Sequence, residues 1–163
     1  MKIIDQRHLD SDNRYSTQPC LLSILEVDDT PATPAALASL NQRLLAMLPG
    51  VRSHAGLVGM RGDDVPHIVR VVQQVALELR RLALNEVTVG FVGVVPRMKG
   101  RYRLVLPYAA KNGAEPALRI ATQMVSALRA GQAFNLPAAV ARLRALADRR
   151  LTARAAVASA VAA

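Results

Sequence analysis

Aromatic side chains are scarce in this chain of 163 residues: they make up 3% of it, and tryptophan is absent. Apolar residues nevertheless make up 52% of the sequence, so its core must consist of packed aliphatic side chains. The length is that of one domain, and a domain of about this size buries roughly 68–70% of the surface that its unfolded chain exposes. We therefore expect one domain with a sizeable aliphatic core.

Long hydrophobic segments are also missing. No apolar run reaches the roughly 18 residues of a transmembrane helix, and the segment Met1–Ile4 lacks the long apolar stretch of a secretory signal. The single cysteine, Cys20, cannot form an internal disulfide, and its neighbours Leu21 and Leu22 favour a buried core position. These features predict a cytoplasmic protein that does not associate with a membrane.

Negative charge is in short supply, because 21 lysines and arginines stand against 12 acidic residues, for a formal net charge of +9. Only three of the basic residues are lysines: Lys2, Lys99 and Lys111. An arginine bias can reflect a GC-rich genome, but guanidinium groups also suit bidentate binding of carboxylate or phosphate. The positive field favours an anionic partner without identifying it.

The pattern of apolar residues and breakers predicts an α+β domain. Thr33 before Pro34 is typical of a helix start, Pro49-Gly50 of a helix end, and 96–100 of a turn between two strands. Residues 1–19 are polar and poorly periodic, so we expect no element there. The predicted elements are a strand at Cys20–Val27, helices at 34–48 and 66–84, strands at 87–94 and 101–108, and helices at 116–129 and 136–150.

This order, β-α-α-β-β-α-α, implies a small, mainly antiparallel sheet covered by helices. We expect the domain to span residues 1–150. The alanine-rich tail at 151–163 is a loosely held helix, the start of a linker, or an arm that needs a partner. The helix at 66–84 is amphipathic, and its second stripe, which we expect to face solvent, consists of His67, Arg70, Gln73, Gln74, Glu78, Arg80 and Arg81.

The ordered set of motifs resembles the N-terminal domain of cyanophycin synthetase, the ligase that builds a polymer of aspartate and arginine. The strongest match is Val-Ala-Leu-Glu-Leu at 75–79, which in that family follows Gly-His-x-x-Glu-His. The family's opening motif is matched only in part, since Asp10-Ser11-Asp12 replaces Arg-Gly-Pro. The other matching residues are Leu9, Asn13, Tyr15, Ser16, Leu48, Pro49, His54, Gly100, Tyr102, Leu104–Leu106 and Tyr108.

The resemblance also indicates a lost activity. Two histidines one helical turn apart with a glutamate are suited to hold zinc and activate water, and the resemblance implies that some members of the family cut polymer with that motif. Here those three positions are Arg70, Gln73 and Gln74. We therefore expect no metal, no cofactor and no catalytic residues in this chain. A residual site of His54 and His67 is a weaker alternative.

The resemblance implies that this domain binds or tethers the aspartate–arginine polymer near the ATP-grasp and Mur-ligase-like domains of a ligase, in cis or in trans. Neither of those domains, nor a phosphate-binding loop, occurs in these residues. The candidates for contact with carboxylates are Arg70, Arg97, Lys99 and Arg101, and those for the arginyl groups are Glu78 and, more weakly, Glu86. Arg103 belongs to the same basic hairpin.

Three alternatives remain open. The chain could be a free-standing adaptor or docking relative with a degenerate metal-hydrolase site, docking through its apolar tail at 155–163. It could bind nucleic acid, since a basic hairpin with tyrosines can contact phosphates and stack bases, although the chain has only five aromatic residues. A second basic group, Arg142 to Arg154 in the last helix, is the solvated face of that helix or part of such a surface. A homo-oligomer is also possible, because the family is oligomeric.

Overall fold

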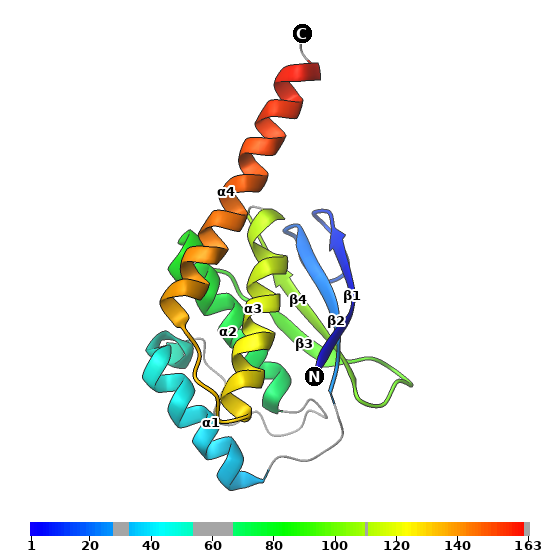
Figure 1. The fold of residues 1–163 in the computed structure, drawn as a ribbon. Coiled ribbons are helices and arrows are strands. Elements are labelled where there is room, and N and C mark those ends of the chain that lie inside the picture. Colours follow the sequence, from blue (N-terminus) through cyan, green and yellow to red (C-terminus); the bar gives the residue numbers. More distant parts are fainter. Residues whose placement is uncertain (28–32, 54–66, 110, 162–163) are drawn as a thin grey trace.

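The computed structural model describes residues 1–27, 33–53, 67–109 and 111–161 and confirms an α+β fold. Four strands form one antiparallel sheet, and the helices pack on one side of it (Figure 1). The strands are β1 (Lys2–Leu9), β2 (Cys20–Glu26), β3 (Phe91–Val94) and β4 (Arg101–Pro107). The helices are α1 (Pro34–Met47), the short 3-10 helix η1 (Pro49–Ser53), α2 (His67–Leu84), α3 (Lys111–Arg129) and α4 (Leu136–Val161).

Strand β1 corrects the expectation that residues 1–19 form no element. The sheet order is β1-β2-β4-β3, so β1 is an edge strand whose only partner in the sheet is β2. Its alternation of polar and apolar residues is interrupted by a register shift between Ile3 and Asp5. A bulge of this kind moves the following side chains to the other face. Polar and apolar residues therefore do not alternate regularly along β1, and the sequence pattern does not indicate a strand. The strand predicted at 87–94 is also shorter, since only Phe91–Val94 is paired.

The helices predicted at 34–48 and 66–84 are confirmed to within one residue, whereas α3 begins at Lys111, before the predicted start at 116. Thr33 caps α1, because its hydroxyl accepts a hydrogen bond of 3.2 Å from the Ala36 amide. Gly131 follows α3 with a φ of 74°, the left-handed conformation that ends many helices. The last helix is longer than predicted: α4 continues through the tail to Val161 and extends beyond the other elements (Figure 1).

Helix α2 lies at the centre of the fold and not at its surface. It packs against the sheet through β3 and β4, against η1, and against α3 and α4. Its apolar stripe is buried as expected, but the prediction that its polar stripe faces solvent is wrong for Gln73, Glu78 and Arg80, whose exposed fractions are 5%, 1% and 0%. Because other elements cover more than one side of α2, these groups need partners inside the protein.

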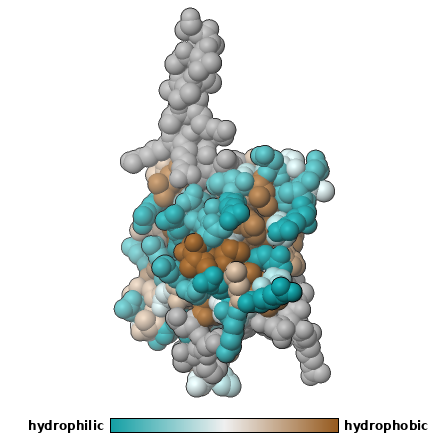
Figure 2. Space-filling model, turned by 90° about the vertical axis from the view of Figure 1, so that its right-hand side faces the viewer, coloured by the Kyte–Doolittle hydropathy of each residue, from teal (hydrophilic) through white to brown (hydrophobic). Residues whose placement is uncertain are grey.

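The sheet divides the molecule into a packed face and an open face. On β2 and β4, Leu21, Leu25, Leu104 and Leu106 turn toward the helices and are fully buried, and Cys20 is buried as predicted. The alternate residues point to the face opposite α2 and α3, which we call the open face. Viewed from the side on which the sheet lies in Figure 1, the surface has an apolar patch surrounded by hydrophilic side chains (Figure 2).

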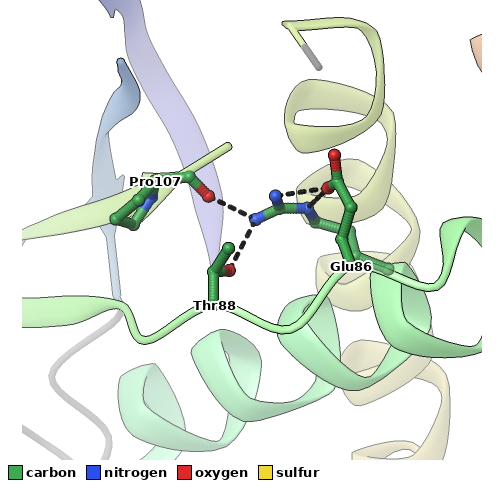
Figure 3. Close-up of polar contacts among 4 residues, drawn as sticks. Glu86, Thr88 and Pro107 are labelled. Carbon is green, nitrogen blue, oxygen red and sulfur yellow. Dashed lines mark hydrogen bonds and ion pairs between the residues drawn. The ribbon is translucent and has the colours of Figure 1, made fainter. Parts of the chain in front are cut away.

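The buried Arg80 side chain ties α2 to the sheet (Figure 3). Its Nε donates a hydrogen bond of 2.9 Å to the Glu86 carboxylate, which also pairs with its Nη2. Its Nη1 donates to the Thr88 hydroxyl at 3.2 Å and to the Pro107 carbonyl at 2.7 Å. One guanidinium group therefore joins the end of α2, the connection to β3 and the end of β4.

Within the described residues, no helix combines the length and hydropathy needed to cross a bilayer.

Candidate binding surface

The turn between β3 and β4 presents the first two candidate cations. Its backbone is tightly hydrogen-bonded: the Val95 amide donates to the Arg101 carbonyl at 3.0 Å, and the Met98 amide donates to Val95 at 3.2 Å. Arg97 has a φ of 62°, a left-handed conformation that is uncommon for a residue with a side chain. Arg97 and Lys99 are both exposed. The turn is thus an ordered segment that carries two cationic side chains at the end of the sheet.

The open face carries two further arginines, which stand two positions apart on β4. Arg101 and Arg103 alternate along β4 with Tyr102 and Leu104, which turn toward the helices. Arg101 lies opposite Glu26 on β2, and its Nε donates to that carboxylate at 3.2 Å. Alternation on a strand places both guanidinium groups on the same side of the sheet.

A shallow basin of about 530 Å³ lies on this face. We call it the open-face basin; its floor includes Leu22 and Ile24 of β2, and its walls include Arg7, Arg14, Tyr15, Arg101 and Arg103. Arg7 comes from β1, Arg14 and Tyr15 from the loop after β1, and the remaining residues from β2 and β4. The β3–β4 turn also lines the basin, through Val95, Pro96 and Met98. Four arginines therefore surround an apolar floor that strands, the loop after β1 and this turn assemble.

Tyr15 is flanked by two of these arginines. The guanidinium carbon of Arg14 lies 4.7 Å from the centroid of its ring, and that of Arg103 lies 5.8 Å away. Arg103 also donates to the Tyr15 hydroxyl at 3.4 Å and to the Val94 carbonyl at 3.1 Å. Its Nε is buried without a hydrogen-bond partner in the described part of the chain. The ring thus contacts two cations, and each cation–π contact contributes about 0.5–1 kcal/mol.

Residues 22–130 match the sequence model of the cyanophycin synthase-like N-terminal domain. The chain belongs to this family. The match begins within β2 and ends just after α3, so it includes the hairpin, the basin floor and the whole of α2. No curated protein matches the chain. The suspected relationship to cyanophycin synthetase is therefore confirmed at the level of the family.

The family motif Val-Ala-Leu-Glu-Leu lies in the middle of α2 and is wholly buried. Glu78, its one charged residue, pairs with Arg81 at distances of 2.7 and 2.8 Å. Its carboxylate also lies against η1, because a Cβ added to Gly50 would stand 2.1 Å from Oε1. The structure thus places Glu78 inside the domain, away from the open face. The weaker candidate Glu86 is bonded to Arg80.

The three positions of the family's metal motif also lie on α2. Arg70 and Gln74 are half-buried and Gln73 is buried, with its amide nitrogen close to Gly90. All three project from α2, so Arg70 is on the other side of the sheet from Arg101. The described residues contain no group of three His, Cys, Asp or Glu side chains close enough to share a metal ion. His54 and the side chain of His67 lie outside what the structure describes.

The second basic group is partly used within the fold. Arg144 on α4 donates to the carbonyls of Leu82 at 2.8 Å and Ala83 at 3.1 Å, at the C-terminal end of α2. A cation at this end satisfies carbonyls that have no partner in the helix and compensates the helix dipole. Sequence reasoning missed this role, and it also missed Arg14 and Tyr15 as parts of the basin. The local signal for Tyr15 was its match to the opening motif of the family.

Proposed function

We propose that this chain is a non-catalytic, polymer-binding N-terminal domain of a cyanophycin synthetase-like, ATP-dependent amide ligase. Its role is to hold the aspartate–arginine polymer near the ligase sites, in cis or in trans, in the cytoplasm. The observation that carries the proposal is the position of Arg97, Lys99 and Arg101. They stand at one end of the sheet, beside a basin with further arginines.

The proposed contacts are individually weak. An exposed ion pair contributes about 0–1 kcal/mol, so affinity depends on many contacts along a repeating chain. A polymer supplies them, because successive units can occupy the turn and the open-face basin at the same time. Glu78 is left out of this surface because its carboxylate is buried, and Arg70 because it projects from α2 on the packed face.

The test is calorimetric titration of the chain with short β-Asp-Arg oligomers and with single-stranded DNA, each at two salt concentrations. We expect binding to the oligomers and none to DNA. Binding to DNA alone, falling steeply with salt, would overturn the proposal and favour a nucleic-acid-binding module. That second function has one observation in its favour, the tyrosine flanked by arginines, since such a ring can stack on a base.

The turn is tested with the double substitution Arg97→Ala and Lys99→Ala. If each side chain contributes about 0.2–1 kcal/mol, the affinity for oligomers falls about two- to thirty-fold. The thermal midpoint should hardly change, because both side chains are exposed. The matched control is Arg43→Ala with Arg142→Ala, which removes two exposed charges from α1 and α4. An affinity that falls equally in both double variants would show that net charge, not this turn, binds the polymer.

A further inference from the structure

The register of the sheet places an acid, an apolar residue and an arginine in one row across the open face. Asp5 on β1 is paired with Ile24 on β2, which is paired with Arg103 on β4. Neighbouring strands are about 4.8 Å apart, so the backbones of Asp5 and Arg103 are separated by about 10 Å. All three residues line the open-face basin. The row therefore presents opposite charges at its two ends with an apolar surface between them.

The arginine end of the row carries two cations, Arg14 and Arg103. The guanidinium carbons of Arg14 and Arg103 lie 4.7 and 5.8 Å from the centroid of the Tyr15 ring, so both cations contact the same side chain. Neither of them has a carboxylate partner among the residues that the structure describes. The Nε of Arg103 is buried and makes no hydrogen bond there. A carboxylate is the group that guanidinium forks bind in a bidentate manner.

The acidic end of the row is accessible. Asp5 is bonded to Arg7 at 3.0 Å, but the side chains are 43% and 70% exposed. An exposed pair of this kind contributes about 0–1 kcal/mol, so a guanidinium group from a ligand can compete for the Asp5 carboxylate. The apolar floor between the ends, with Ile24 at its centre, can pack against a methylene chain.

We propose that the open-face basin binds one arginyl unit of the polymer across the strands. Its carboxylate contacts Arg14 and Arg103, its methylene chain lies over Ile24, and its guanidinium group lies on Asp5. This inference rests on the proposed function for the choice of polymer, but it adds a site across the strands, beside the turn, and a direction of binding. An arginyl unit fits this row because it carries a carboxylate and a guanidinium at the two ends of a short methylene chain.

The test combines ligand variants with protein variants, by calorimetric or NMR titration of the whole chain. One ligand is a short β-Asp-Arg oligomer; in the second, carboxamides replace the carboxylates of the arginyl units, and in the third, citrulline replaces arginine. The protein variants are Arg14→Gln, Arg103→Lys and Asp5→Asn. The control is Arg142→Gln, which removes an exposed positive charge from α4, a helix that packs on α2 and α3 and not on the open face.

Each ligand change should weaken binding to the natural chain by up to about five-fold, as expected for one exposed charge contact. In Arg14→Gln and Arg103→Lys, the carboxamide ligand should bind almost as tightly as the unmodified oligomer, while the citrulline ligand should still bind more weakly. In Asp5→Asn, the citrulline ligand should bind almost as tightly as the unmodified oligomer, while the carboxamide ligand should still bind more weakly. In Arg142→Gln both penalties should persist. This crossed pattern assigns each end of the ligand to one end of the row.

Penalties that are the same in all variants would overturn the inference. If the oligomer still binds in that case, the proposed function stands and the unit lies elsewhere, for example on the turn. If the natural chain binds no oligomer, both the proposed function and the inference fail. Because Arg103 donates to a backbone carbonyl, the fold of Arg103→Lys is checked by circular dichroism, and the exposed Arg14→Gln supplies the same comparison independently.

Discussion

Replacement of Arg80 by alanine tests whether the buried polar contacts hold α2 and the sheet together. The Arg80 side chain is fully buried, and its partner Glu86 is 11% exposed. The substitution leaves the Glu86 carboxylate, the Thr88 hydroxyl and the Pro107 carbonyl without the donor that they share (Figure 3). The loss is therefore larger than that of one hydrogen bond.

The magnitude follows from the burial of the pair. Removal of one member of a buried ion pair costs about 3–5 kcal/mol, because the other charge stays in a medium of low polarity. For a domain of this size, that lowers the thermal midpoint by roughly 6–20 °C. The matched control is Arg119→Ala on α3, which breaks an ion pair with Glu115. The Arg119 side chain is 63% exposed. That loss should be about 0–1 kcal/mol.

The assay is urea unfolding followed by far-ultraviolet circular dichroism, with the midpoint and the slope fitted separately. A second variant, Arg80→Met with Glu86→Leu, removes both charges and keeps apolar volume, and it should recover much of the lost stability. A loss for Arg80→Ala no larger than that for Arg119→Ala would refute the reasoning. It would mean that water or another group solvates Glu86 when the arginine is gone.

Further predictions concern packing, the thiol and the metal positions. Gly50→Ala should lower the free energy of unfolding by about 1–3 kcal/mol, because the new Cβ would meet the buried Glu78 carboxylate at 2.1 Å; an unchanged urea midpoint would contradict this. Burial raises the pKa of the Cys20 thiol, so a thiol reagent should label it only after unfolding, and rapid labelling of the native chain would disprove its protection. The folded protein holds that proton more tightly, so its stability should fall as pH rises above 9.0, the ordinary pKa of the thiol, and this part of the fall should be absent from Cys20→Ala. Added zinc should give no hydrolysis of the polymer, and cleavage that a chelator abolishes would be contrary evidence.

The sequence motif that best matches the family has a structural role in this fold. Val75 to Leu79 pack between the sheet and the other helices, and even Glu78 is directed inward, where it contacts Arg81 and lies under η1. A helix in this position must match several neighbours at once, which restricts its sequence more than a surface helix is restricted. The motif therefore identifies the fold, while the side chains proposed for binding lie on other elements.

The turn at 96–100 could be predicted from the sequence because its signals are local. Proline and glycine mark the turn, and Arg97, Lys99 and Arg101 are close in the chain. The open-face basin could not be found in this way. Asp5, Ile24 and Arg103 come from three strands, and their common row depends on a register that includes a bulge in β1. The partnership of Tyr15 with Arg103 likewise joins residues that are 88 positions apart.

The sequence by itself determined the elements that short-range physics controls. Capping by Thr33, the stop at Pro49, the alternation along β4 and the aliphatic character of the core all follow from neighbouring residues. Only the tertiary structure decided which polar side chains face solvent. Periodicity shows that Arg80 and Arg103 lie on polar stripes, but burial depends on what packs over each stripe. Helices cover the stripe that carries Arg80, so this arginine stabilises the fold. Arg103 lies on the face of the sheet opposite α2 and α3, where we propose that it contacts a ligand.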